Sequence, residues 1–127
     1  MTYKIKIYKG GREFKIPLKV FDEFKEVVKH GVGCELFTSE SSYIIRITEI
    51  LPIRYILVDP ENECGKIIDI DEDFVTVKIT NKNINIEKFE DLLDKGKIMA
   101  YMRASGYKRD TVTEVFRILT FDLVIGA

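Results

Sequence analysis

Apolar and polar residues alternate at the N-terminal end of the chain, which is the pattern of a half-buried β-strand. Over 3–8, tyrosine and isoleucine side chains fall on one side of an extended segment and lysines fall mainly on the other. Two glycines at 9–12 predict a turn, and 13–18 reads as a return strand. The N-terminal residues therefore predict a β-hairpin.

Two later segments change to a helical spacing. Apolar residues recur three and four positions apart within 21–30 and again within 86–95, which predicts two short amphipathic helices. Gly31 and Gly96 supply the left-handed residue that commonly ends a helix, and Asn85 is a suitable N-cap for the second one.

The rest of the chain favours strands, because Ile, Val and Thr make up 36 of its 127 residues. A Ser-Glu-Ser-Ser turn and a loop through Gly106 are expected to separate some of these strands. The pattern predicts one α+β domain over 1–127, with a mostly antiparallel sheet and two short helices. The further strands are predicted at 34–38, 43–50, 53–58, 66–70, 74–80, 98–103 and 112–125.

The two halves of the chain share an order of elements, hairpin–helix–hairpin. Segment 21–31 aligns with 86–96, with phenylalanine and glycine identical at two aligned positions. This order indicates a duplicated ββαββ unit, as an internal pseudo-repeat over 3–58 and 65–125. The alternative is that any short amphipathic helix ended by glycine gives the same match.

Charge and composition narrow the classes of function. The net charge of −1 gives no global field that would attract nucleic acid or anionic lipid, so such binding requires a local patch. The apolar runs are too short to span a bilayer, and we expect a cytoplasmic protein without a membrane partner. The absence of Gln and the abundance of Lys, Glu and Ile fit a thermophilic microbe or its virus, or else an AT-rich genome.

Residues that carry chemistry are sparse. The acidic run 69–73 either binds a divalent cation or caps a hairpin turn, and it lacks the spacing of an EF-hand. His30 and Cys34 are separated by two glycines, so no helical face aligns them as a catalytic pair. Cys34 and Cys64 are either small half-buried residues or a disulfide. We therefore expect no catalytic residue, metal site or cofactor.

The best candidate for binding is a basic and aromatic stretch near the C-terminus. Arginine pairs with phosphate and tyrosine stacks on bases, so the stretch suits a nucleic acid or a nucleotide. The alternative is a solvated loop whose cations are offset by Asp110 and Glu114. The candidate residues are Tyr101, Arg103, Tyr107, Lys108, Arg109 and Arg117.

The final strand, 112–125, has apolar residues on both faces. It is either a central strand covered on both sides or an edge that pairs with a second copy. Together these patterns predict a non-enzymatic binding or assembly protein that self-associates through strand edges or binds another protein. The alternative prediction is a nucleic-acid or nucleotide binder that uses the region 101–117.

Overall fold

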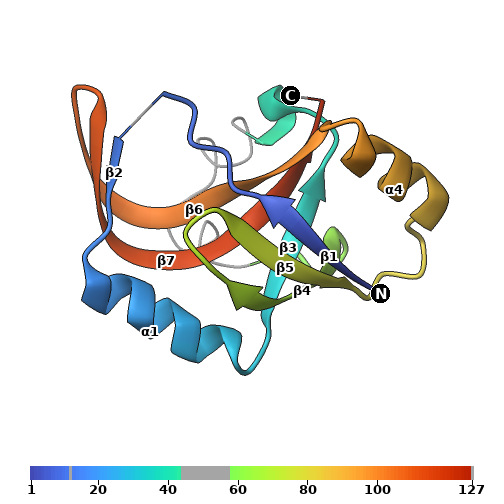
Figure 1. Ribbon diagram of the computed structural model, residues 1–127, viewed down its shortest axis with the longest axis horizontal. Helices are drawn as coiled ribbons and strands as arrows, with labels where there is room; N and C mark the ends of the chain where they lie inside the picture. Colours follow the sequence, from blue (N-terminus) through green and yellow to red (C-terminus); the bar gives the residue numbers. More distant parts are fainter. Residues whose placement is uncertain (12, 44–57, 127) are drawn as a thin grey trace.

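The computed structural model describes residues 1–11, 13–43 and 58–126, and its elements are drawn in Figure 1. The strands alternate buried and exposed residues, and each helix turns one apolar side toward the sheet. In chain order the elements are β1 (Thr2–Lys6), β2 (Glu13–Lys15), α1 (Leu18–Val28), β3 (Val32–Phe37), β4 (Glu63–Ile70), β5 (Phe74–Ile79), α4 (Ile86–Asp94), β6 (Ile98–Arg109) and β7 (Val112–Ile125).

The strands form one seven-stranded sheet in the order β1-β5-β4-β3-β7-β2, with β6 also paired to β7. β1, β5, β4 and β3 are joined by antiparallel pairs, as are β6 and β7, whereas β7 runs parallel to both β3 and β2. The prediction of an α+β fold is confirmed, but the sheet is mixed rather than mostly antiparallel. The prediction assumed that strands adjacent in sequence pair as hairpins, whereas β3 and β2 reach β7 through longer connections.

The sheet curls back on itself. Just beyond β1, Ile7 bridges Ala100 of β6 in a parallel sense, and the Tyr8 amide donates to the Ala100 carbonyl over 2.8 Å. Two register shifts between β6 and β7, at Arg103/Ala104 and at Ser105/Gly106, bend this long hairpin into the arc seen in Figure 1. The curled sheet thereby surrounds its own core.

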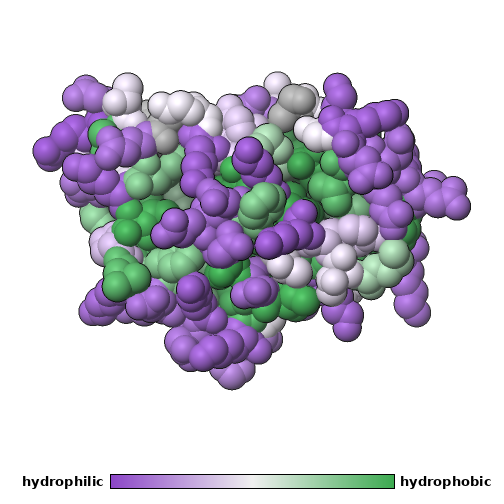
Figure 2. All heavy atoms as spheres, viewed as in Figure 1, coloured by the Kyte–Doolittle hydropathy of each residue, from purple (hydrophilic) through white to green (hydrophobic). Residues whose placement is uncertain are grey.

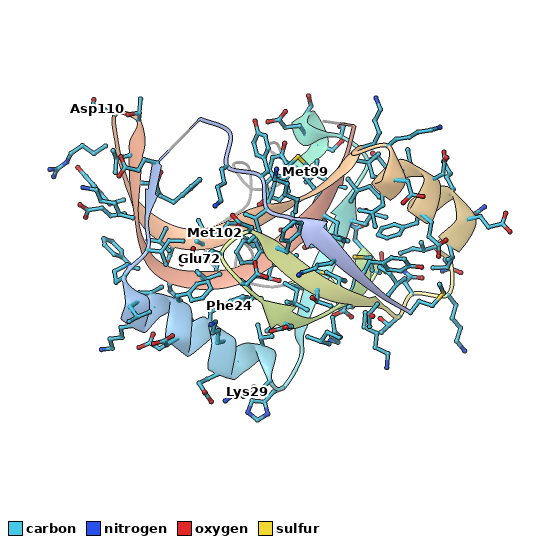
Figure 3. The ribbon with its side chains drawn as sticks, viewed as in Figure 1. Phe24, Lys29, Glu72, Met99, Met102 and Asp110 are labelled. Atoms are coloured by element: carbon cyan, nitrogen blue, oxygen red, sulfur yellow. The ribbon has the colours of Figure 1, made fainter. Side chains whose placement is uncertain are left out.

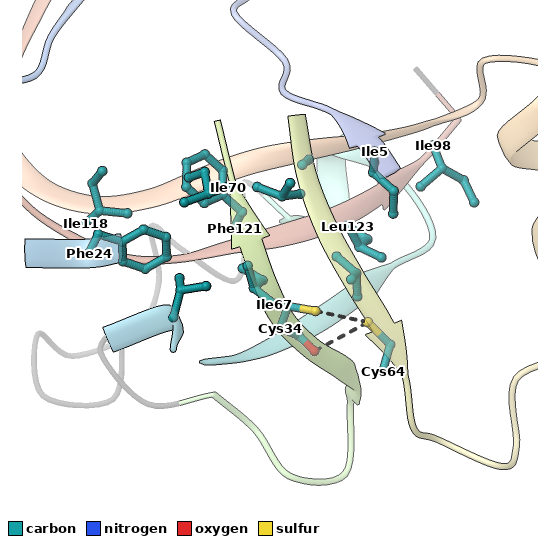
Figure 4. Close-up of a cluster of buried hydrophobic side chains, with 14 of the residues drawn as sticks. Ile5, Phe24, Cys34, Cys64, Ile67, Ile70, Ile98, Ile118, Phe121 and Leu123 are labelled. Carbon is teal, nitrogen blue, oxygen red and sulfur yellow. Dashed lines mark hydrogen bonds between the residues drawn. The ribbon is translucent and has the colours of Figure 1, made fainter. Parts of the chain in front are cut away.

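The core is built from β-branched and aromatic side chains that point into the curl (Figure 4). Ile5, Ile67 and Leu123 are fully buried there. Phe24 of α1 packs against Phe121 of β7, with ring centroids 5.8 Å apart. Burial of large apolar side chains is the main favourable term for such a fold.

The predicted N-terminal hairpin is wrong. β1 pairs with β5 and β2 pairs with β7, so the two segments lie in different parts of the sheet. Alternation identifies an extended segment but does not identify its partner. Pro17 lies within the segment 13–18 that was predicted as the return strand, but it is the N-cap residue of α1.

The C-terminal half follows the prediction more closely. β4 and β5 form the expected hairpin, and the Asn85 side chain accepts the Lys88 amide at 3.1 Å as the N-cap of α4. β7 has the predicted bounds and is central, with neighbours on both sides. The residues predicted as a loop through Gly106 continue β6 as far as Arg109.

Residues 40–43 are helical where a turn was predicted, and the Ser39 hydroxyl accepts the Ser42 amide at their start. The fold thus has a third short helical segment beside the two that were predicted. The strands predicted at 43–50 and 53–58 lie outside the described residues except at their ends, Tyr43 and Val58. Because β4 and β5 pair while β1 and β2 do not, the proposed duplication is unconfirmed.

Candidate functional site

A pocket of about 500 Å³ opens where the start of α1, β2 and the curled sheet meet. Figure 2 shows hydrophobic atoms exposed between β2 and α1 and framed by hydrophilic ones. The pocket exists because α1 crosses below the β6–β7 arc and β2 attaches only to its outer half. Its size is within the range of about 300–1,000 Å³ that is usual for small-molecule sites.

The walls of the pocket are apolar. They are contributed by four separate segments of the chain, so no continuous motif in the sequence announces them. The end of β1 supplies an aromatic ring, β2 and the start of α1 form the outer wall, and the β6–β7 hairpin forms the floor. The apolar and aromatic lining residues are Ile7, Tyr8, Phe14, Ile16, Leu18, Phe21, Met102, Ile118 and Phe121.

Charged side chains stand at the rim. Lys9 comes from the segment between β1 and β2, and Glu13 is the first residue of β2. Asp71 and Glu72 come from the β4–β5 turn. Figure 3 labels Glu72 and, on β6, the wall residue Met102. An apolar interior with a few polar groups at its mouth is the usual composition of a ligand site.

The acidic residues 71–73 form the turn between β4 and β5. The Asp71 carboxylate accepts the backbone amides of Asp73 and Phe74, each at 2.8 Å, and these bonds lower the pKa of Asp71. This is the turn-capping alternative of the sequence analysis. In the described part of the chain, no three His, Cys, Asp or Glu residues are grouped in a way that could hold a metal ion.

The sequence-predicted binding residues do not form one site. Tyr107 is 54% exposed, and the Arg109 guanidinium lies 5.6 Å from the centre of its ring. Arg117 is also exposed, on β7, and Lys108 is placed by the register opposite Thr113. These residues belong to the outer half of the β6–β7 hairpin.

Arg103 lies near the middle of β6 and is only 2% exposed. Its Nε atom donates to Asp122 over 2.8 Å, and Nη2 donates to Glu35 over 2.6 Å. The second Asp122 oxygen accepts the Glu35 amide at 3.1 Å, and the Asn62 side chain donates to Glu35. Arg103 therefore joins β6, β7 and β3 within the fold and is turned away from external ligands.

Burial is the main influence on the pKa of Asp122 in this cluster. It raises the pKa of Asp122 to about 6, although the Arg103 guanidinium acts in the opposite direction. Sequence reasoning missed the cluster because it treated arginine as a surface residue. The available signal was Asp122 itself, a lone acid within the apolar run 121–125, because a buried acid requires a partner.

Tyr101 is also buried, within a smaller aromatic cluster on the other face of the hairpin from the pocket. Its ring stacks on Tyr8 at 4.4 Å and meets Tyr43 edge-on at 5.3 Å. Burial, and then the nearby Glu40 and Tyr8 side chains, raise the pKa of Tyr101 to about 12. Tyr101 thus supports Tyr8, which lines the pocket, and is not itself at the surface.

The cysteines and the histidine are separate from the pocket. Cys34 and Cys64 are free thiols, fully buried, with their sulfur atoms 3.5 Å apart (Figure 4). His30 is exposed just beyond α1, so it does not share an environment with Cys34.

In the described residues, the helices are too short or too polar to cross a membrane.

Comparison with known proteins provides no family assignment for this arrangement. The chain matches no protein-family model, no curated protein and no solved structure.

Proposed function

We propose that the protein is a non-enzymatic binding protein that takes an apolar small molecule into the pocket between α1, β2 and the β6–β7 hairpin. The supporting observation is the pocket itself, about 500 Å³ in volume with apolar and aromatic walls. A ligand there would shield side chains that water otherwise reaches, and each buried methylene contributes about 0.8 kcal/mol.

Leu18 is the most exposed apolar residue of the lining, at 74%. A single exposed leucine is common at protein surfaces, but at this position it also provides an apolar lip for an incoming ligand. A ligand that covers about half of this side chain gains roughly 1 kcal/mol, which is about fivefold in affinity.

The test is titration with a neutral, environment-sensitive naphthylamine dye, followed by fluorescence. We expect one bound dye per chain, displaced by primary alcohols with an affinity that rises about fourfold per added methylene. L18S should weaken dye binding about fivefold. The matched control is V27S, because Val27 is also an exposed apolar residue of α1 but does not line the pocket.

Backbone amide NMR spectra give an independent readout of the location. Dye binding should shift the amides of Phe14, Ile16 and Phe21, and leave those of α4 unchanged. Absence of saturable binding, or equal affinities of L18S, V27S and the wild type, would reject the proposal.

A second candidate function is nucleic-acid or nucleotide binding by the outer half of the β6–β7 hairpin. The supporting observation is that Phe116 and Tyr107 are 61% and 54% exposed beside Arg109 and Arg117. Anisotropy of a labelled oligothymidylate should then rise at low salt and fall steeply as salt is added, and R109A should weaken the binding. K95A, on the far side of the molecule, is the control.

Self-association through strand edges is also proposed, since exposed aromatic residues beside short outer strands favour contact between copies. Light scattering across a hundredfold range of protein concentration tests it. A constant monomer mass would exclude it.

A further inference from the structure

The rim of the pocket is more acidic than the molecule as a whole. Its lining includes three carboxylates, Glu13, Asp71 and Glu72, and one ammonium group, Lys9. The Lys9 Nζ atom lies 3.1 Å from Asp73, which adds a fourth carboxylate beside the mouth. The only cation of the lining is therefore already paired within the described residues.

Two further lysines approach the rim. Lys25 Nζ lies 4.9 Å from the centre of the Phe21 ring. Lys4 Nζ lies 3.9 Å from Asp71 and 5.1 Å from the centre of the Phe74 ring. The described groups around the mouth are then four carboxylates and three ammonium groups, an excess of one negative charge. No described contact neutralises the Glu13 or Glu72 side chain.

The walls suit a positive charge as well. Tyr8, Phe14 and Phe21 contribute aromatic rings to the pocket. Ring faces attract cations, and an organic ammonium group is desolvated at lower cost than a metal ion. A carboxylate or sulfate group at the same mouth would instead meet like charge.

We infer that the ligand is an organic cation with an apolar body, such as an alkylammonium or arylammonium compound. This inference rests on the proposed ligand-binding function of the pocket. The apolar part lies against the floor formed by Met102, Ile118 and Phe121, and the positive group remains at the mouth beside Glu13 and Glu72.

The experiment compares three ligands with the same ten-carbon chain: decyltrimethylammonium, decanol and decyl sulfate. Each displaces the neutral dye below its micelle concentration, in 20 mM and in 500 mM salt. We expect the ammonium compound to bind about fivefold more tightly than the alcohol in low salt, and the sulfate to bind more weakly than the alcohol. High salt should reduce both differences, because exposed charges are screened.

E72Q and E13Q should each lower the preference for the ammonium compound over decanol about twofold to fivefold. Their side chains make no described hydrogen bond, so folding should be preserved. Asp71 is unsuitable for substitution because it holds the turn. E61Q, which replaces an exposed acid outside the lining, is the control and should change neither affinity.

The outcomes separate the two proposals. If decanol binds and the three ten-carbon ligands have equal affinities, or if E72Q and E13Q match E61Q, the cation inference is overturned while the pocket remains a binding site. If none of the three displaces the dye, or the dye itself does not bind, the proposed function fails first.

Discussion

Replacement of Arg103 by methionine should remove a large part of the stability of the fold. The guanidinium contacts Glu35 at 2.6 Å and Asp122 at 2.8 Å, and all three side chains are at most 1% exposed. Methionine keeps the length and the apolar stem of arginine but takes the positive charge from both carboxylates. Removal of one partner from a buried ion pair costs about 3–5 kcal/mol, against a total of roughly 5–15 kcal/mol for a domain.

The pH dependence identifies the cause of the loss. Because the pKa of Asp122 is raised to about 6 in the folded state, the folded protein binds this proton more readily than the unfolded chain does. The resulting stability is fully present below pH 4 and is lost as the pH rises through 6. Without Arg103 the pKa of Asp122 moves higher still. The destabilisation of R103M should therefore be smaller at pH 5 than at pH 8, by about 1–2 kcal/mol.

Urea unfolding followed by far-UV circular dichroism at pH 5 and pH 8 measures both quantities. The matched control is R117M, which replaces an exposed arginine of the same hairpin and should change the free energy of unfolding by less than about 0.5 kcal/mol. If R103M lost no more than R117M, or lost the same amount at both pH values, the buried charges would not act as described.

Two further predictions concern local packing. A Cβ atom at Gly106 would lie 2.2 Å from the Glu114 carbonyl oxygen, so G106A should lower the free energy of unfolding by about 2 kcal/mol or more in thermal or urea unfolding. At Gly96 a Cβ atom would meet nothing within 4 Å. G96A should therefore cost only about 1 kcal/mol, because of the positive φ at that position. The contact with Cys64, and then burial, raise the pKa of Cys34. Both thiols are fully buried, so neither should react with iodoacetamide at pH 8 until the protein is unfolded. Rapid alkylation of native protein, counted by mass spectrometry, would contradict this.

Sequence periodicity predicted the elements better than their partners. The helical spacing before Gly96 and the alternation on each side of Asp71 are local, and the corresponding segments fold as predicted. The pairing of β1 with β5 joins residues about seventy positions apart, and nothing in either strand specifies it. Strand pairing depends on how the whole core is filled, so local patterns leave it open.

The same limit applies to the functional residues. Basic and aromatic side chains near one another in the sequence suggested a single site, but Tyr101 and Arg103 are buried while Tyr107 and Arg109 are exposed. Two bulges in the hairpin separate these pairs, and the bulges follow from the register with β7. The linear cluster was therefore divided by the bending of one strand.

The pocket, in contrast, brings together residues that are far apart in the sequence. Its acidic rim comes from residues that read as turn formers, and its walls come from residues that read as core. Asp71 is a turn former in the structure too, yet the geometry that it fixes places Glu72 at the mouth of an apolar cavity. Leu18 is the lining residue that is apolar, at a helix start, and mostly in water. The other apolar lining residues belong to the core or pack against it, so their substitution would also disturb folding, whereas Leu18 can be changed with little effect on the core. For this reason the comparison of L18S with V27S distinguishes a binding pocket from an incidental gap more directly than any substitution of the buried walls.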